Sequence, residues 1–208
     1  MSFEVEVRRT LGDRMIEACF AAPSGLTVLR GVSGAGKTSV LNMVAGLLTP
    51  DQGRIIVNGQ TLFDGAAGTN LPPHRRRLGY VFQDARLFPH MRVRGNLLYG
   101  YRLAPVDDRW MTLDEVVAFL GIAPLLDRWP RSLSGGEAQR VALGRALLSG
   151  ARALLMDEPL ASIDPARRSG IIEAILRIRN ELSLPMLYVT HDPAEAEQLA
   201  TQLVTIGG

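Results

Sequence analysis

The chain has 208 residues and a formal net charge of +2, from 23 Lys plus Arg and 21 Asp plus Glu. This charge is too small to predict nucleic-acid binding by itself, and 47% hydrophobic residues are enough to form the core of a globular domain. The single cysteine, Cys19, excludes an intramolecular disulfide and fits a reducing compartment. The N-terminus lacks the apolar core of a signal peptide, and no apolar run approaches the roughly 18 residues needed to cross a bilayer.

The first 84 residues predict short strands with one helix among them. Period-two alternation and compact apolar runs indicate the strands. Helical spacing begins at Lys37 and continues through Val44 to Leu47, and we expect this helix to end near Pro50. A polar loop is expected at 64–77, where the run Arg75–Arg77 faces solvent. The predicted strands are residues 3–7, 15–21, 26–30, 54–59 and 78–82.

The rest of the chain alternates helices with buried strands. Residues 92–150 are mainly helical and contain no β-type run. Two later helices begin at Asp164-Pro165 and Asp192-Pro193, where Asp caps the helix and Pro occupies its first turn. This alternation predicts a largely parallel sheet covered on both faces, with the all-helical stretch as an inserted subdomain. The predicted strands here are residues 153–156, 186–190 and 203–208.

Residues 31–38, GVSGAGKT, fit the phosphate-loop pattern G-x-x-x-x-G-K-[ST] between a predicted strand and a helix. The glycines allow backbone N–H groups to turn toward an anion at the helix N-terminus. Lys37, the only lysine, is expected to reach the β- and γ-phosphates, and Thr38 to coordinate Mg²⁺. A chance glycine-rich turn would need neither the helix onset nor the lysine in register. The predicted nucleotide-binding residues are Gly31, Val32, Ser33, Gly34, Ala35, Gly36, Lys37 and Thr38.

Two carboxylates follow the predicted strand at 153–156. A carboxylate at the C-terminal end of a buried parallel strand points into the crevice where α/β folds bind ligands. We expect Asp157 to hold Mg²⁺ through water and Glu158 to polarise an attacking water as a general base. Taken alone, the pair also fits a solvated strand end; the phosphate loop is what favours the functional interpretation.

A second helix N-terminus has unusual glycines. Ser134 and Glu137 form a capping box, which by itself would start a helix running to Leu148. Capping does not explain Gly135 and Gly136, because glycine is a poor helix former. Both glycines make sense if an anion must approach the backbone closely. The chain therefore has two helix N-termini suited to bind a phosphate group, but only one lysine.

The loop at 31–38, LSGGE at 133–137 and LLMDEP at 154–159, in this order, resemble the ATP-binding cassette (ABC) ATPases over nearly the whole chain. The resemblance implies an α/β fold. A P-loop NTPase (RecA-like) core, residues 1–84 and 151–208, would carry an N-terminal antiparallel β subdomain and an inserted α-helical subdomain, residues 85–150. It also implies a head-to-tail homodimer with ATP at the interface, held by the loop of one copy and by Ser134, Gly135 and Gly136 of the other.

Shorter motifs acquire roles through the same resemblance. Gln83 corresponds to a glutamine that senses Mg²⁺ and the γ-phosphate. Asp164 corresponds to the D-loop, which lies beside the nucleotide. His191 corresponds to the switch histidine that contacts the γ-phosphate. Without the resemblance, a histidine at a strand end is more often a hydrogen-bonded surface residue, and Gln83 by itself does not indicate a function. The cofactors implied are ATP and Mg²⁺. The implied catalytic residues are Glu158, His191 and Gln83, and the implied metal ligands are Thr38, Gln83 and Asp157.

Residues 81–100 resemble, more narrowly, the ATPase subunits of molybdate importers. This implies contact with transmembrane permease subunits through the segment after Gln83, a cytoplasmic location on the inner face of the cell membrane, and an external binding protein that acts indirectly. An aromatic and Arg-bearing surface suits such an interface. Packing within the helical subdomain explains Phe88 and Tyr99 equally well. The interface candidates are Phe88, Arg92, Arg94 and Tyr99.

Two departures from the family pattern affect the ATP site and regulation. Residues 8–14 offer no aromatic side chain to stack on adenine. The C-terminal oxyanion-binding regulatory domain that such ATPases usually carry is expected to be absent from residues 1–208.

Other functions are less compatible with the motifs. A cassette ATPase acting on nucleic acid usually has a coiled-coil insertion or a second cassette, for which the segment from Gln83 to Leu133 is too short. A P-loop kinase or GTPase is also less compatible, because a monomeric phosphate site does not need a second glycine-rich helix start such as LSGGE. Molybdate rests on resemblance alone, and tungstate or sulfate stays open as the transported anion.

Overall fold

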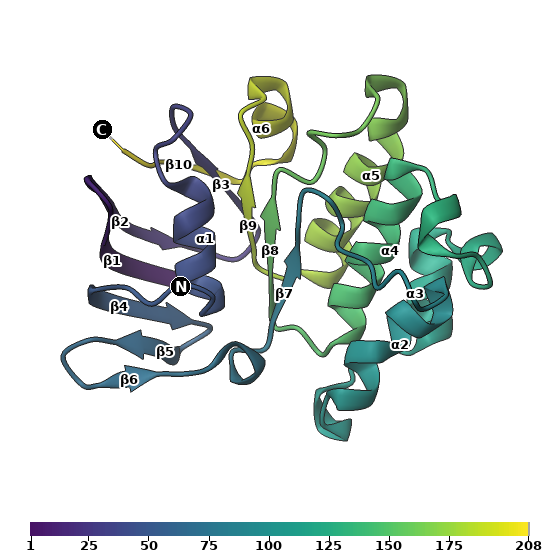
Figure 1. Ribbon diagram of the computed structural model, residues 1–208, viewed down its shortest axis with the longest axis horizontal. Coiled ribbons are helices and arrows are strands. Elements are labelled where there is room, and N and C mark those ends of the chain that lie inside the picture. Colours follow the sequence, from purple (N-terminus) through teal and green to yellow (C-terminus); the bar gives the residue numbers. More distant parts are fainter. Residues whose placement is uncertain (208) are drawn as a thin grey trace.

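Two five-stranded sheets organise the molecule, which we describe from a computed structural model covering residues 1–207 without the side chains of residues 166 and 167 (Figure 1). The first sheet is antiparallel, with strand order β2-β1-β4-β5-β6. It confirms the predicted N-terminal β subdomain and includes a strand, β5, that the sequence patterns did not predict. Its strands are β1 Phe3–Leu11, β2 Arg14–Ala22, β4 Gln52–Val57, β5 Gln60–Asp64 and β6 Thr69–Asn70.

The second sheet is parallel, with strand order β10-β3-β9-β8-β7. The predicted α/β core is therefore confirmed. Gly208, the last residue of the strand predicted from residue 203, lies outside the described residues. The strands are β3 Leu26–Arg30, β7 Leu78–Val81, β8 Ala153–Asp157, β9 Met186–Val189 and β10 Gln202–Thr205.

Strand β8 shows how the parallel sheet is covered on both faces. Ala153 and Leu155 pack with α1 (Lys37–Ala45) and the N-terminal sheet. Leu154 and Met156 point the other way and pack with α4 (Gly135–Leu148) and α5 (Pro165–Arg177). All four side chains are fully buried, as a strand between two apolar layers requires. Helices α1 and α4 consequently lie on opposite faces of the sheet (Figure 1).

The predicted helical stretch is confirmed by α2 (Val93–Leu103), α3 (Leu113–Leu120) and α4, and its described residues contain no strand. Asn96 of α2 is fully buried, and its side chain accepts a hydrogen bond from the Phe88 N–H (2.7 Å) and donates to the Met91 carbonyl (3.0 Å). This amide fixes the segment before α2. The chain continues through a π-helical turn at Ile178–Leu182 to α6 (Pro193–Leu199).

Helix α1 ends earlier than expected. It stops at Ala45, because Gly46 adopts a left-handed conformation (φ +79°) that terminates the helix, rather than near Pro50. Leu47, which favoured the longer prediction, is an exposed side chain.

The predicted loop at 64–77 is also corrected, because it contains β6 and a 3₁₀ turn at Pro73–Arg75. Arg76 is 2% exposed and does not face solvent as expected. Its guanidinium donates to the carbonyls of Met43 (2.8 Å) and Val44 (2.9 Å), so it satisfies the C-terminal end of α1. Burial lowers the pKa of Arg76 to about 10.

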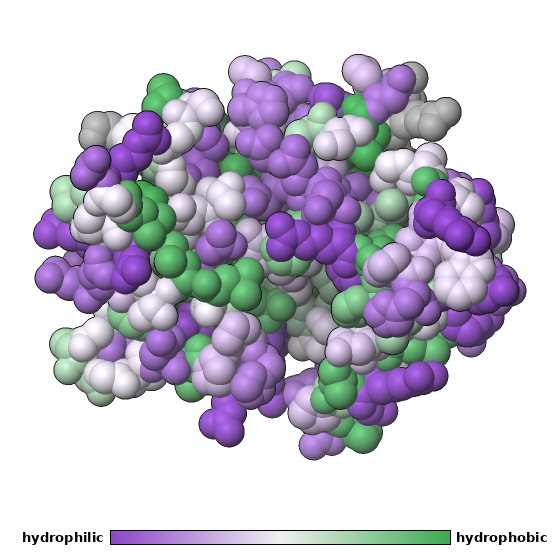
Figure 2. Space-filling model, in the orientation of Figure 1, coloured by the Kyte–Doolittle hydropathy of each residue, from purple (hydrophilic) through white to green (hydrophobic). Residues whose placement is uncertain are grey.

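The surface differs from one part of the molecule to another. Over α6 and the carboxyl ends of β8 and β9 it is mostly hydrophilic, whereas hydrophobic residues gather where α2 ends (Figure 2). Leu103 and Val106 are 72% and 74% exposed there. None of the helices within residues 1–207 is both long and apolar enough to span a membrane.

Candidate active site

A glycine-rich loop connects β3 to α1. Gly34 and Gly36 adopt left-handed conformations (φ +81° and +91°), which glycine reaches without strain. A Cβ atom at Gly36 would also lie 2.7 Å from Cγ2 of Ile16. No side chain caps the start of α1, so its first N–H groups are available to an anion.

Lys37 is held inside this loop. The residue is 7% exposed, and its ammonium donates to the carbonyls of Gly31 (2.9 Å) and Val32 (3.1 Å). These bonds satisfy a buried charge and tie the loop to the start of α1. A slim stem with a compact charge suits this position better than the broad, planar fork of arginine.

Thr38 and Asp157 meet across the start of α1 and the end of β8. The Thr38 hydroxyl donates to Oδ1 of Asp157 at 2.9 Å. Burial raises the pKa of Asp157, which a bound cation would counteract. A hydroxyl and a carboxylate are oxygen donors of the kind that Mg²⁺ prefers, so these two residues fit the predicted metal site.

Glu158 and His191 come together from neighbouring strands. Each follows the carboxyl end of its strand, β8 and β9, and Oε2 of Glu158 lies 3.0 Å from Nδ1 of His191. Glu158 has a left-handed backbone (φ +46°), fixed by a hydrogen bond from its N–H to the Val189 carbonyl (3.0 Å). Such a conformation is costly for a residue other than glycine and is concentrated at functional sites. The His191 ring is 68% exposed, so it can reach a ligand.

The glycine-rich loop, Thr38, Glu158 and His191 border a cavity of about 680 Å³, a volume typical of small-molecule sites. One wall comes from the β1–β2 hairpin, which no motif had indicated as part of a site. The sequence indicates this hairpin only through residues 8–14, where an aromatic side chain that stacks on adenine would be expected and is absent. The lining residues are Leu11, Arg14, Ile16, Ser33, Gly34, Gly36, Lys37, Thr38, Ser39, Glu158 and His191.

Gln83 lies at the same edge of the sheet but does not line this cavity. It follows β7, next to β8, and its side chain is exposed. Gln139 of α4, which is buried, donates to the carbonyls of Phe82 (3.0 Å) and Gln83 (2.8 Å). Helix α4 therefore holds the segment that carries Gln83, a role for Gln139 that the sequence did not reveal.

Ser134, Gly135 and Gly136 lie away from the cavity in this chain, as does Asp164. The predicted capping box is present: the Ser134 hydroxyl accepts from the Glu137 N–H (3.3 Å), and Glu137 accepts from the Ser134 N–H (2.7 Å). The Ser134 N–H lowers the pKa of Glu137. A Cβ atom at Gly135 would lie 2.8 Å from Cδ1 of Ile163, so glycine also permits close approach of the segment before α5.

Comparisons with known proteins point to one family. The family model for the ABC transporter matches residues 21–161. The chain is 52% identical over 205 residues to the molybdenum import ATP-binding protein ModC of Paramagnetospirillum magneticum, covering 99% of this chain and 56% of the relative. It is 54% identical over 202 residues to ModC of Brucella melitensis, with 97% and 56% covered. The chain thus spans a little over half the length of these curated relatives.

Two solved structures share the fold. The first is cbiO1 from Clostridium perfringens, part of the ABC transporter complex cbiONQ, with a TM-score of 0.81, 25% identity, and 99% of this chain and 84% of that chain covered. The second is the ATP-binding cassette MJ0796, a dimer in a post-hydrolysis state with ADP and Pi, with a TM-score of 0.77, 21% identity, and 99% and 93% covered.

Proposed function

The chain belongs to the ABC transporter family, and we propose that it is the ATP-hydrolysing subunit of an importer that takes up an oxyanion, molybdate. The observation that carries the ATPase proposal is the 3.0 Å contact between Glu158 and His191 beside the buried Lys37. The substrate is inferred from relatives that are about half identical to this chain and are named molybdenum import proteins. No feature of the described residues favours the nucleic-acid alternative.

In the proposed mechanism, the loop N–H groups at the start of α1 bind the phosphates of ATP. Lys37 exchanges its two carbonyl acceptors for oxygens of the β- and γ-phosphates. Glu158 accepts a proton from the attacking water as the water oxygen bonds to the γ-phosphorus and the bond to the β–γ bridging oxygen breaks, so that ADP leaves; His191 positions Glu158 and contacts the γ-phosphate. Thr38 and Asp157 would hold Mg²⁺, with Gln83 approaching from β7. When bound, this ion neutralises charge on the phosphate oxygens.

We infer that a second copy completes the site. Ser134, Gly135 and Gly136 do not border the cavity beside the phosphate loop of their own chain, and α4 packs on the sheet face opposite to α1. A head-to-tail pair places the α4 N-terminus of each copy against the loop of the other, which is the isologous contact of a two-fold dimer. Asp164 would lie beside this contact. The dimeric cassette with 21% identity offers a precedent in the same fold.

We propose that the permease binds at the segment after Gln83. Phe88 already packs within the chain, with its ring 4.6 Å from that of Tyr99 and below the Arg145 guanidinium. Arg92, Arg94 and Tyr99 remain exposed, as an interface requires. This contact would place the chain on the inner face of the cell membrane, and an external binding protein would act through the permease.

The transport proposal predicts ATP-driven uptake of molybdate. The chain would be assembled in vesicles with the permease and the binding protein of a molybdate importer, and uptake of radioactive molybdate would be measured with ATP in the compartment that the chain faces. We expect uptake that depends on both ATP and the chain, with sulfate competing poorly. Uptake that is unaffected by omitting the chain, or equal uptake of sulfate, would contradict the proposal.

The cavity also suggests how the base is bound without an aromatic residue. The Arg14 guanidinium reaches the loop, since a Cβ atom at Gly34 would lie 2.8 Å from its Nη1. A planar guanidinium can stack on a base, with Leu11 and Ile16 supplying apolar contact. Arg14→Ala should therefore weaken ATP binding about 10-fold by calorimetry, and Arg14→Trp should restore it, because base stacking contributes roughly 1–3 kcal/mol.

Two controls separate base binding from other effects. Arg8→Ala removes an exposed arginine of the same hairpin, paired with Glu17 at 3.0 Å, and should leave ATP binding unchanged. Inorganic tripolyphosphate has no base. If Arg14→Ala weakened tripolyphosphate binding as much as ATP binding, Arg14 would be acting on the phosphates and the base-stacking role would be wrong.

A further inference from the structure

A buried carboxylate lies behind the site and takes no part in the mechanism above. Glu195 of α6 is 6% exposed. Its Oε2 accepts from the hydroxyls of Tyr188 (3.0 Å) and Thr190 (2.8 Å), and its Oε1 pairs with Arg168 of α5 at 3.2 Å. Burial raises the pKa of Tyr188, and the neighbouring Glu195 raises it further. A carboxylate removed from water is tolerated only with such a full set of donors.

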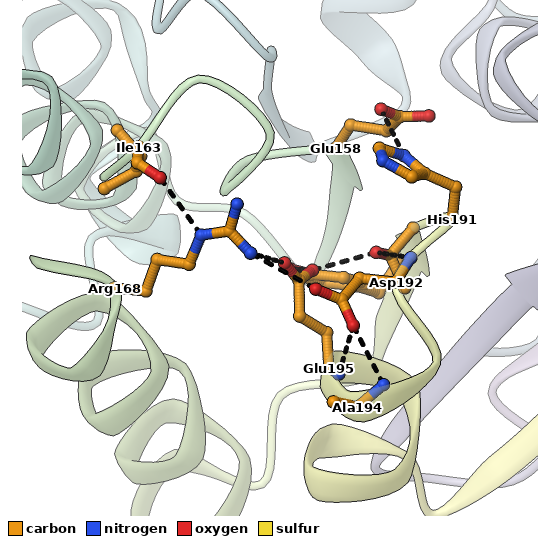
Figure 3. A network of polar contacts seen from close by, with 9 residues as sticks. Glu158, Ile163, Arg168, His191, Asp192, Ala194 and Glu195 are labelled. Atoms are coloured by element: carbon orange, nitrogen blue, oxygen red, sulfur yellow. Dashed lines mark hydrogen bonds and ion pairs between the residues drawn. The ribbon is translucent and has the colours of Figure 1, made fainter. Parts of the chain in front are cut away.

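Arg168 links this carboxylate to two loops of the site (Figure 3). Its Nε donates to the Ile163 carbonyl (3.0 Å), in the segment that leads from Glu158 to α5. Its Nη1 lies 3.2 Å from both Asp192 and Glu195. One guanidinium therefore joins the segments that follow β8 and β9.

The residues on either side of His191 both belong to this network. Thr190 donates to Glu195 and accepts from the Asp192 N–H (3.0 Å), and Asp192 caps α6 while pairing with Arg168. The exposed His191 ring itself contacts only Glu158 among the interactions described for it. Its position therefore depends on how its two chain neighbours are fixed.

We propose that Arg168 is a positioning residue for hydrolysis: with Glu195 as its buried anchor, it sets the His191 loop relative to the segment after Glu158. A small cavity of about 30 Å³ lies between these groups and is bordered by Glu158, Arg168 and His191, so the guanidinium adjoins the catalytic pair without taking part in proton transfer. This inference rests on the proposed ATPase function for its kinetic part only.

The first test is kinetic. Arg168→Met should lower kcat for ATP hydrolysis by about 10- to 100-fold, the loss expected from a misplacement near 1 Å. ATP binding measured by calorimetry should stay within about 2-fold of wild type. Arg168→Lys keeps the charge but cannot reach all three acceptors, so it should recover part of kcat. Adding Arg168→Met to His191→Ala should cost little more than His191→Ala alone, because both changes act through one histidine.

The matched control is Arg177→Met on the same helix. Arg177 also donates to a backbone carbonyl, that of Phe119 (2.6 Å), and pairs with a carboxylate, Glu181, at 2.8 Å, but neither contact touches the His191 loop. We expect its kcat to be unchanged. An equal loss of kcat in Arg177→Met, or a loss in Arg168→Met matched by a loss of ATP affinity, would overturn the positioning role.

The second test does not need ATPase activity. The chain has three histidines, His74, His90 and His191, so their imidazole resonances can be assigned by single substitutions. In the nucleotide-free chain, Arg168→Met should shift the His191 resonance and leave those of His74 and His90 in place. An unchanged His191 resonance would overturn the inference. Absence of ATP hydrolysis by the wild-type chain would instead count against the proposed function, and the resonances would still decide the role of Arg168.

Discussion

Glu158→Gln is expected to bind ATP normally, to lower hydrolysis by about 100- to 10,000-fold and to accumulate as an ATP-bound dimer. The amide keeps the size of the carboxylate and can still hydrogen-bond His191, which lies 3.0 Å away. It cannot accept a proton from water. The left-handed backbone at this position is equally available to both residues. Binding and closure would therefore continue while the chemical step stops.

Hydrolysis by this variant would be followed by phosphate release, and its binding by calorimetry. Glu4→Gln, which changes an exposed carboxylate on β1, is the matched control and should behave as wild type. If Glu158→Gln hydrolysed ATP within a few-fold of wild type, a general-base role for Glu158 would have to be abandoned.

Ser134→Asp should reduce hydrolysis by at least about 100-fold while leaving ATP binding to the separate chain unchanged. Aspartate is as good an N-cap as serine, so α4 keeps its capping interaction with the Glu137 N–H. Its negative charge would repel a γ-phosphate presented by a second copy. The repulsion is therefore electrostatic and arises only when two copies of the chain associate around ATP.

The chain supplies a close control for this substitution. Thr112 caps α3 through the same capping box, with Glu115 in the place of Glu137. Thr112→Asp introduces the same charge at the same helix position and should leave hydrolysis and ATP binding unchanged. Comparable inactivation by Thr112→Asp would show that a charge at a helix start is harmful in general.

The phosphate loop and the Glu158–His191 pair could be predicted because their chemistry follows from short-range pattern and from sheet topology. Eight consecutive residues, flanked by a strand and a helix, specify the loop. The pair meets because β8 and β9 are parallel neighbours, so their carboxyl ends share one edge. Neither result needs knowledge of distant side chains.

Buried polar groups with distant partners could not be predicted. Arg76 resembles the arginines beside it, and only the path of the chain brings it under the end of α1. Gln139 stabilises the segment with Gln83 from 56 positions away, and Arg168 reaches Glu195 from 27 positions away. A sequence pattern carries no signal for which member of a polar run becomes buried, because burial is decided by packing between elements.

The sequence does not indicate the cavity wall formed by Arg14, for a related reason. Position 14 is one of many exposed residues on a hairpin, and its nearness to Gly34 depends on how the antiparallel sheet lies against the parallel one. The end of α1 is a different case: Gly46 is a recognisable C-terminal signal, but Leu47 continues the hydrophobic spacing and so favours a longer helix, although its side chain is exposed.

The most direct test that each ATP site is shared between two copies is analytical sedimentation with MgATP. It compares the oligomeric state of Glu158→Gln with that of the double variant Glu158→Gln/Ser134→Asp. We expect a dimer for Glu158→Gln and a monomer with ATP still bound for the double variant. If the double variant bound ATP as a dimer, or if Ser134→Asp abolished ATP binding to the monomer, Ser134, Gly135 and Gly136 would not act from a second copy, and the shared ATP site would be wrong.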